Sequence, residues 1–454
     1  MPKITAYIPA HNYGKFIKRC IDSVLAQKFY DWELIVINDG STDNTAELLT
    51  SYANNKKIRI IQQEKKGLTT TNNIALRLSQ GEYIMRLDAD DYLDENALLV
   101  LSNILDTHPD VGLVYPDYYR MDEEGEIIDI ERRKKIGLED CLLDLPAHGA
   151  CTMIRKKCLL DLGGYDETLP CQDGYELWLR FIEKYKPYNV NIPLFYYRQH
   201  PASLTQDKEK ILKVRHRIKR NFVKSKFGKA IPRVLAIVPA RKTWGRAPDC
   251  ATRSINAKPL IYYTLSEASK TVLLDKIVLV ANDKDLLKYG RSFTRVMCMV
   301  RPDELSLPNS RIEPTVNYVL RLLKKKSGYA PDAVMLLYPH APLRKKMHIE
   351  KAIDTMVIFN TDSVVSVCED ANFFYRHSEW GLKPLFKKRL LRLERDALFR
   401  ENGAIYLSKI KAIKKDNFLG DKIGHITMLP QESIKADSQF NGWLIEKIIK
   451  EWKK

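Results

Sequence analysis

The sequence predicts an α/β protein with two Rossmann-like nucleotide-binding domains. Two short apolar strand patterns, at residues 4–9 and 234–239, each end in proline, and an alternation of strand and helix patterns follows each of them. Open α/β sheets bind nucleotides at the carboxyl ends of their strands, so each start indicates a nucleotide-type site. A chain of 454 residues also fits two domains of about 200 residues each.

The two halves show the same order of elements. Because strands alternate with helices, we expect mostly parallel sheets covered by helices. In the first half the strand patterns fall near 4–9, 33–38, 57–62, 82–87 and 111–115, and the helical patterns near 15–28, 43–54, 68–79 and 94–106. In the second half the strand patterns fall near 234–238, 276–281, 333–338 and 363–367, and the helical patterns near 259–270, 314–325 and 347–358.

Composition indicates a reduced, cytoplasmic protein. The chain is 45% hydrophobic and 29% charged, as soluble globular proteins are. The first strand pattern begins at Ile4, which leaves no room for a signal peptide, and no apolar run approaches the roughly 20 residues of a membrane span. The eight cysteines contain no C-x-x-C pair, so we expect no structural zinc.

The formal charge of +17 is compatible with nucleic acid, an anionic membrane surface or phosphorylated substrates. No nucleic-acid-binding motif accompanies it, so we expect no nucleic-acid partner. The charge therefore identifies no partner by itself.

A basic segment separates the two halves. Residues 208–229 carry ten Lys or Arg against one acid, Glu209, with apolar residues at helical spacing. We expect a solvated connector helix; the alternative is a helix that rests on an anionic membrane, which would make the protein peripheral at the inner face of the membrane. The predicted domains are residues 1–207 and 232–454, with 208–231 as the helical linker.

Acidic residues lie at three places in the first half, two of them directly after strand patterns and one at the start of a helical pattern. Asp39 follows one strand pattern, Asp88 and Asp90 follow another, and Asp173 opens a helical pattern. A diphosphate leaving group needs a hard divalent cation, which carboxylates on a rigid turn can hold. A hydroxyl acceptor needs a separate general base. Asp88 and Asp90 suit the first task, and Asp173 suits the second.

Residues 1–205 resemble an inverting family 2 glycosyltransferase of the GT-A fold. The matching segments are Ile8-Pro9-Ala10-His11-Asn12, Asn38-Asp39-Gly40-Ser41-Thr42-Asp43, Gly81-Glu82-Tyr83-Ile84, Leu87-Asp88-Ala89-Asp90-Asp91, Gln172-Asp173 through Leu177-Trp178, and Tyr197-Arg198-Gln199-His200. The resemblance implies that Pro9, His11 and Asn12 line the pocket for the nucleotide base. It also implies that Asp39 contacts the base and that Asp88 lies near the ribose.

The same resemblance assigns the remaining polar residues. Asp90 would hold Mg²⁺ or Mn²⁺ on the diphosphate, and Asp173 would deprotonate the acceptor. His200 is a candidate metal or diphosphate contact, with a hydrogen-bonded surface histidine as the equal alternative. One segment departs from the family: Thr71-Asn72-Asn73 stands where members often carry Ala-Arg-Asn, which removes a possible phosphate or donor contact.

Residues 233–454 resemble the cytidylyltransferases that make CMP-activated acidic sugars, so a cytidylyltransferase-like fold is expected there. The resemblance rests on segments such as Pro239-Ala240-Arg241, Arg301-Pro302-Asp303-Glu304-Leu305 and Pro342-Leu343-Arg344, and on Arg400-Glu401-Asn402-Gly403. The candidate nucleotide or sugar site comprises Arg241, Arg246, Arg344, Arg400, Asn402 and Asp437.

The motifs that carry the cytidylyl reaction are degenerate in this half. The family's phosphate loop P-A-R-G-G-S-K-G here carries Lys242-Thr243 for the two glycines, and Gly245 for the lysine. The family's D-I-D metal motif reads Lys435-Ala436-Asp437, which places an ammonium where a carboxylate belongs. We therefore expect impaired or lost catalysis in the second domain.

These observations predict a metal-dependent inverting glycosyltransferase. It would move a sugar from a nucleotide-diphosphate donor, UDP being favoured, to a hydroxyl of a glycan or lipid-linked glycan, in bacterial surface polysaccharide assembly. One alternative is a bifunctional enzyme that also activates an acidic, sialic-acid-like sugar with CTP. Another is a second domain that only binds a ligand or forms a homodimer.

Overall fold

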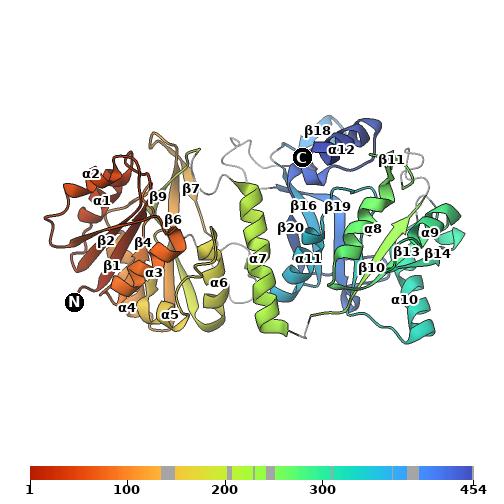
Figure 1. The fold of residues 1–454 in the computed structure, drawn as a ribbon, viewed down its shortest axis with the longest axis horizontal. Helices are drawn as coiled ribbons and strands as arrows, with labels where there is room; N and C mark the ends of the chain where they lie inside the picture. Colours follow the sequence, from red (N-terminus) through yellow and green to blue (C-terminus); the bar gives the residue numbers. More distant parts are fainter. Residues whose placement is uncertain are drawn as a thin grey trace. The chain divides into compact units, whose positions relative to one another are not determined.

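The computed structural model describes residues 1–133, 149–201, 207–228, 231–241, 251–307, 310–370, 372–385 and 398–451. The chain forms two compact units, Met1–Arg215 and His216–Lys454 (Figure 1). The division falls inside helix α7 (Lys208–Phe227). The helical pattern expected at residues 208–229 forms α7 over residues 208–227, and its role as a linker stays a prediction.

The first unit is built on one mixed sheet, in which nine strands lie within the described residues. The path runs β3-β2-β1-β4-β8-β6-β9-β5, with β7 beside β6. The strands are β1 (Ile4–Ala10), β2 (Trp32–Asp39), β3 (Ile58–Gln63), β4 (Tyr83–Arg86), β5 (Tyr92–Leu93), β6 (Val111–Met121), β7 (Ile127–Glu131), β8 (Met153–Arg155) and β9 (Lys186–Arg198). Strands β3, β2, β1 and β4 are parallel, and β8 is antiparallel to both β4 and β6.

Helices cover both faces of this sheet. Its helices are α1 (Ile17–Leu25), α2 (Thr45–Thr50), α3 (Leu68–Leu78), α4 (Ala97–Thr107), α5 (Lys156–Asp161) and α6 (Asp173–Lys184). Side chains of a strand alternate between faces, so Ile4 and Ile8 pack with α1, α2 and α4, whereas Tyr7 packs in the cluster that α3, α5 and α6 complete. Because β1 is buried on both faces, its sequence is apolar at most positions rather than alternating, and the hydroxyl of its one Thr, Thr5, is hydrogen-bonded.

The second unit has a seven-stranded mixed sheet within the described residues, in the order β14-β13-β10-β15-β19-β16-β20. The strands are β10 (Val234–Ala240), β13 (Leu274–Ala281), β14 (Val296–Val300), β15 (Ala333–Leu336), β16 (Ser363–Asp370), β19 (Leu398–Lys409) and β20 (Ile423–Thr427). Two hairpins, β11 (Ser254–Ile255) with β12 (Lys258–Pro259) and β17 (Tyr375–Ser378) with β18 (Gly381–Pro384), lie outside this sheet. The helices are α8 (Leu260–Lys270), α9 (Lys284–Gly290), α10 (Glu313–Ser327), α11 (Lys346–Ile358) and α12 (Gln439–Glu451).

The two sheets start in the same way. In the first unit the parallel order is β3-β2-β1-β4, and in the second it is β14-β13-β10-β15. Counted along the chain within each sheet, the first strand of these four therefore lies between the second and the fourth. The expectation of an α/β protein with a Rossmann-like sheet is confirmed. The predicted assignment of the second unit to a cytidylyltransferase-like fold stays a prediction.

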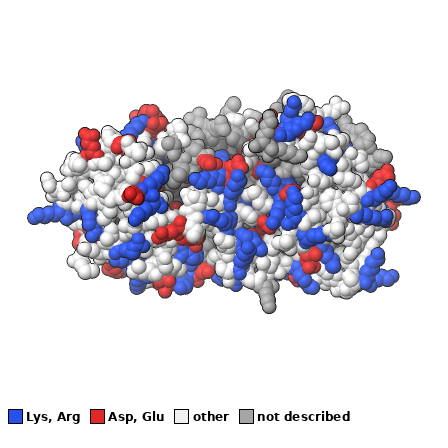
Figure 2. Space-filling model, viewed as in Figure 1, with Lys and Arg blue, Asp and Glu red and all other residues white. Residues whose placement is uncertain are grey.

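Surface and length features add two findings. No helix in the described ranges is both long enough and apolar enough to cross a membrane. On the face drawn in Figure 2, Lys and Arg side chains are interspersed with Asp and Glu.

Candidate active site

The carboxyl ends of β1 and β2 meet in two turns that hydrogen-bond to each other. Asn12 adopts a left-handed conformation (φ 62°), and its Oδ1 accepts the Thr42 N–H at 2.7 Å. The backbone N–H of Asn12 donates to Ser41 Oγ at 2.9 Å, and His11 Nδ1 lies 2.8 Å from the Asp39 carbonyl oxygen. The structure thus brings the His11–Asn12 turn beside Asp39, and the assignment of these residues to a nucleotide pocket stays a prediction.

Asp39 is buried, and its carboxylate accepts three hydrogen bonds. Gln63 Nε2 and the Lys66 N–H donate to Oδ1 at 2.7 and 2.6 Å, and the Gly67 N–H donates to Oδ2 at 2.8 Å. Gly67, with φ 88°, immediately precedes α3. Asp39 therefore also shapes the turn that leads into α3, a role that the sequence did not indicate.

Three carboxylates follow β4. Asp90 and His200 are both 8% exposed, and His200 Nε2 lies 2.9 Å from Asp90 Oδ2. Asp91 Oδ1 accepts the Arg198 N–H at 2.9 Å, so the last residue of β9 is tied to the same loop. Burial and the neighbouring carboxylates Asp90 and Asp88 raise the pKa of Asp91 well above its usual range.

Asp173 is the first residue of α6, and it is 5% exposed. Its Oδ2 accepts a hydrogen bond from Arg86 Nη1 at 2.6 Å and another from Asn72 Nδ2 at 3.0 Å. Arg86 also forms an ion pair with Asp88, with 2.8 Å between Nε and Oδ1. Burial raises the pKa of Asp88 to about 6, because Asp90 and Asp173 add to the effect of burial and Arg86 only partly offsets it.

Sequence reasoning missed Arg86. Arg86 ends the strand Tyr83–Arg86, and all four residues of this strand are buried. The available signal in the sequence was a single arginine at the end of an apolar strand pattern. A buried guanidinium is stable only beside anionic partners or good acceptors, and that requirement points to carboxylates at the strand end.

The donor set at the β4 loop is compatible with a divalent cation. Asp90 supplies a carboxylate and His200 an imidazole, and the described residues contain no cluster of three or more His, Cys, Asp or Glu that could hold a metal by themselves. Mg²⁺ is commonly held by one or two carboxylates together with substrate phosphates, so two protein ligands suffice when the donor supplies the rest.

The second unit has a pocket of about 440 Å³ at the carboxyl ends of β10, β14 and β15. It is lined by Arg241, Arg301, Arg311 and His340 together with Glu313 and Asp416, among others. Arg301 is 2% exposed, and its Nε and Nη2 have no hydrogen-bond partner among the described groups. Burial and the adjacent Arg241 lower the pKa of Arg301 to about 10.

Apart from Arg241, the candidates of the second unit that the structure describes are not among the residues that line this pocket. Arg344 and Asn402 are buried: Arg344 donates to the Ala404 carbonyl and to Thr264 Oγ1, and Asn402 bonds Ser366 and Ser433. Arg344 Nε has no hydrogen-bond partner among the described residues, and a ligand-binding role for these two residues stays a prediction. Arg400 pairs with Asp370, and Asp437 accepts a hydrogen bond from Asn441. Arg246 lies outside the described residues, as does the rest of the degenerate loop from 242 to 250.

The segment that replaces the metal motif faces His340. The Ala436 N–H donates to the His340 carbonyl at 2.8 Å. Burial, followed by the positive charges of Lys435 and Arg344, lowers the pKa of His340 to about 4. Lys435 therefore adds positive charge beside His340, and the assignment of residues 435–437 to a former metal motif stays a prediction.

Comparison with known proteins finds a glycosyltransferase family match within the first unit. Residues 5–163 match the model of Glycosyl transferase family 2, so this part of the chain is a family 2 domain. The chain is 31% identical over 184 residues to a chondroitin synthase of Escherichia coli. The aligned region covers 40% of this chain and 27% of that protein. It is 38% identical over 130 residues to a hyaluronan synthase of Pasteurella multocida, and this aligned region covers 28% of this chain and 13% of that protein.

A similarity to solved structures is weaker. The structure of residues 1–349 of TarS from S. aureus aligns with a TM-score of 0.41 at 19% identity, over 50% of this chain and 67% of that chain. The chain spans about a quarter or less of the length of the synthases named above.

Proposed function

We propose that the chain is a metal-dependent inverting glycosyltransferase that moves a sugar from a UDP-sugar to a hydroxyl of a glycan or lipid-linked glycan. The observation that carries the proposal is the placement of Asp173 beside the carboxylates that follow β4, joined to Asp88 through Arg86. This arrangement offers one carboxylate for proton transfer and a separate acidic loop for a nucleotide diphosphate.

Asp173 is the proposed general base. Arg86 and Asn72 both bond its Oδ2, which leaves Oδ1 to accept the proton of the acceptor hydroxyl. The acceptor oxygen then forms a bond to the anomeric carbon on the face opposite the diphosphate. The bond between that carbon and the phosphate oxygen breaks, so the configuration inverts and the electron pair leaves with the diphosphate.

Asp90 and His200 are the proposed ligands of Mg²⁺ or Mn²⁺, which would neutralise charge on the leaving diphosphate. Pro9, His11, Asn12 and Asp39 would hold the base, and Asp88 the ribose. Support for this comes from the hydrogen bonds that join the two turns at the ends of β1 and β2.

Substitution of Asp173 tests the base. Asp173→Asn should abolish transfer from a panel of UDP-sugars with Mn²⁺, while UDP still binds to the full chain, because the amide is close in shape to the carboxylate but cannot take the proton. Asp166→Asn, in the loop that precedes α6, is the matched control and should transfer normally. Near-normal turnover by Asp173→Asn would refute the assignment of the base.

A second candidate function concerns the second unit. We propose that its pocket binds an anionic ligand through Arg301 and Arg241 without turnover. A buried guanidinium with two unpaired nitrogens is costly unless an anion accepts hydrogen bonds from it. Inorganic phosphate, pyrophosphate, CMP and CTP can be screened by thermal shift on the full chain. If none of the four ligands shifts the melting temperature, the anion site is refuted.

Two alternatives for the second unit and the membrane alternative for the basic helix are tested separately. Release of pyrophosphate from CTP with nonulosonic acids and Mg²⁺ would establish the bifunctional enzyme. Homodimerisation is tested by the mass of the full chain in solution, and contact with an anionic membrane by co-sedimentation with anionic vesicles.

A further inference from the structure

The guanidinium of Arg86 contacts two carboxylates with different proposed roles. Asp173 is the proposed base, and Asp88 is the proposed contact of the donor ribose. Arg86 Nη1 lies 2.6 Å from Asp173 Oδ2, and Arg86 Nε lies 2.8 Å from Asp88 Oδ1. Arg86 is 7% exposed, and the side chain of Asp173 is 6% exposed. The ion pair with Asp173 is therefore shielded from solvent, where charge interactions are strong and directional, whereas the Asp88 side chain is 27% exposed.

The space for this guanidinium depends on Gly149. A Cβ placed on Gly149 would lie 2.2 Å from Arg86 Nη2 and 2.7 Å from Arg86 Cζ. Real Cβ atoms do not approach other atoms so closely, so any side chain at position 149 would push the guanidinium from its place. The backbone at Gly149 and the two carboxylates thus fix Arg86 from different sides.

Asn72 completes the arrangement around the base. Its Nδ2 donates to the same oxygen of Asp173 that Arg86 contacts, at 3.0 Å, and Asn72 is fully buried. Because two donors hold Oδ2 of Asp173, its carboxylate cannot rotate freely. The orientation of Oδ1 is therefore fixed as well.

We propose that Arg86 is a positioning residue of the transferase: it orients the carboxylate of Asp173 for proton transfer and links it to Asp88 on the donor side. This inference rests on the proposed function, because it needs Asp173 to be the base. Arg86 touches neither the sugar nor the acceptor in this role and acts through the two carboxylates. Misplacing a reacting group by about 1 Å costs on the order of 100-fold in rate.

Three variants of the full chain separate this role from simple stabilisation. Arg86→Met should lower kcat by about 100-fold or more, while the Kd for UDP changes by less than about tenfold. Arg86→Lys should recover part of the loss, since an ammonium retains the charge but cannot pair with both carboxylates in the same geometry. Gly149→Ala should lower kcat by about tenfold or more with the charge intact, because it displaces the guanidinium.

Arg155 provides the matched control. It is a buried arginine of β8 in the same sheet, 8% exposed, and it donates to the backbone carbonyls of Val111 and Leu105 rather than to the candidate site. Arg155→Met should lower the melting temperature, while kcat per UDP-binding molecule stays within about threefold of wild type.

The outcomes distinguish this inference from the proposed function. If Asp173→Asn still transfers sugar, the proposed base is wrong, and the role of Arg86 falls with it. If Asp173→Asn is inactive but both Arg86→Met and Gly149→Ala keep kcat within about threefold of wild type, only the positioning role is overturned. It is also overturned if Arg155→Met lowers kcat as much as Arg86→Met does. Should Arg86→Met fail to fold, Gly149→Ala alone decides.

Discussion

His200 Nε2 lies 2.9 Å from Asp90 Oδ2, although the two residues are 110 positions apart in the chain. Strand β9 ends at Arg198, whose backbone N–H bonds Asp91, so the segment after β9 returns to the loop after β4. The ring of His200 also lies beside Phe16, with 5.5 Å between the ring centroids. This packing holds the imidazole against the carboxylate.

Removing the imidazole should weaken metal binding more than it weakens chemistry at saturating metal. We expect His200→Ala to raise the Mn²⁺ concentration for half-maximal transfer by about 10- to 100-fold, because one of two protein ligands is lost. Transfer rates measured across a Mn²⁺ titration check this. An unchanged titration curve would leave His200 as a hydrogen-bonded histidine, the alternative that the sequence left open.

Asp39 should matter for both stability and nucleotide binding. Asp39→Ala removes the acceptor of the Gln63 side chain and of two backbone N–H groups in a buried turn. We expect a loss of about 2–3 kcal/mol in unfolding free energy and weaker UDP binding. Thermal and urea denaturation, with isothermal titration of UDP, measure both effects. Asp31→Asn, at an exposed position, is the control and should change neither.

The sequence predicted the strand ends of the first unit better than the contacts between them. The pattern at residues 4–9 corresponds to β1, and the acidic residues after β2 and β4 lie at the same edge of the sheet, because parallel neighbouring strands end together. The Arg86–Asp173 contact could not be predicted in this way. Its partners are 87 positions apart, and hydrophobic periodicity carries no information about which carboxylate a buried arginine meets.

A similar limit applies to the second unit. Arg344 and Asn402 were chosen from motif matches, and most of their polar atoms bond carbonyl and hydroxyl groups of the interior, although Arg344 Nε has no hydrogen-bond partner among the described residues. Polar residues that hold a fold and polar residues that bind a ligand look alike in a sequence. Arg301, which the sequence placed only within a framework motif, is the buried arginine that lines the pocket.

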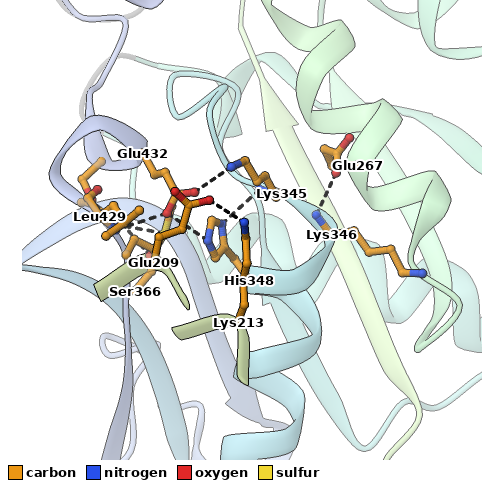
Figure 3. A network of polar contacts seen from close by, with 12 residues as sticks. Glu209, Lys213, Glu267, Lys345, Lys346, His348, Ser366, Leu429 and Glu432 are labelled. Carbon is orange, nitrogen blue, oxygen red and sulfur yellow. Dashed lines mark hydrogen bonds and ion pairs between the residues drawn. The ribbon is translucent and has the colours of Figure 1, made fainter. Parts of the chain in front are cut away.

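A buried polar network in the second unit should make its stability depend on acid pH. Lys345 Nζ lies 2.9 Å from Glu432 Oε1, and His348 Nε2 lies 3.2 Å from Oε2 (Figure 3). The Lys345 N–H donates to His348 Nδ1, so the proton of a neutral ring resides on Nε2 and points to Glu432. Burial opposes the charge of Glu432, but His348 and Lys345 outweigh it and lower the pKa of Glu432 to about 2.

The sign of the pH effect follows from this pKa. An unfolded glutamate takes up its proton near pH 4.3, whereas folded Glu432 resists protonation, so falling pH favours the unfolded state below about pH 4.5. We expect Glu432→Gln to lower the melting temperature at pH 7 and to differ less from wild type as the pH falls from about 5 to 3. Melting curves across this range test the prediction, and a constant difference between the two proteins would contradict it.

Arg301 should show opposite effects on stability and on ligand binding. Its Nε and Nη2 are buried without hydrogen-bond partners, and no ion pair joins it to a carboxylate among the residues that the structure describes. An unsatisfied buried polar group costs about 1–3 kcal/mol, so Arg301→Met should raise the melting temperature of the ligand-free chain. The same variant should lose any stabilisation by phosphate or pyrophosphate, because the buried cation of the pocket is gone.

Thermal shift with and without each anion measures both effects, with the exposed Arg291→Met as control. If Arg301→Met melts at a lower temperature and still responds to the anions, Arg301 is a structural residue and the anion site lies elsewhere.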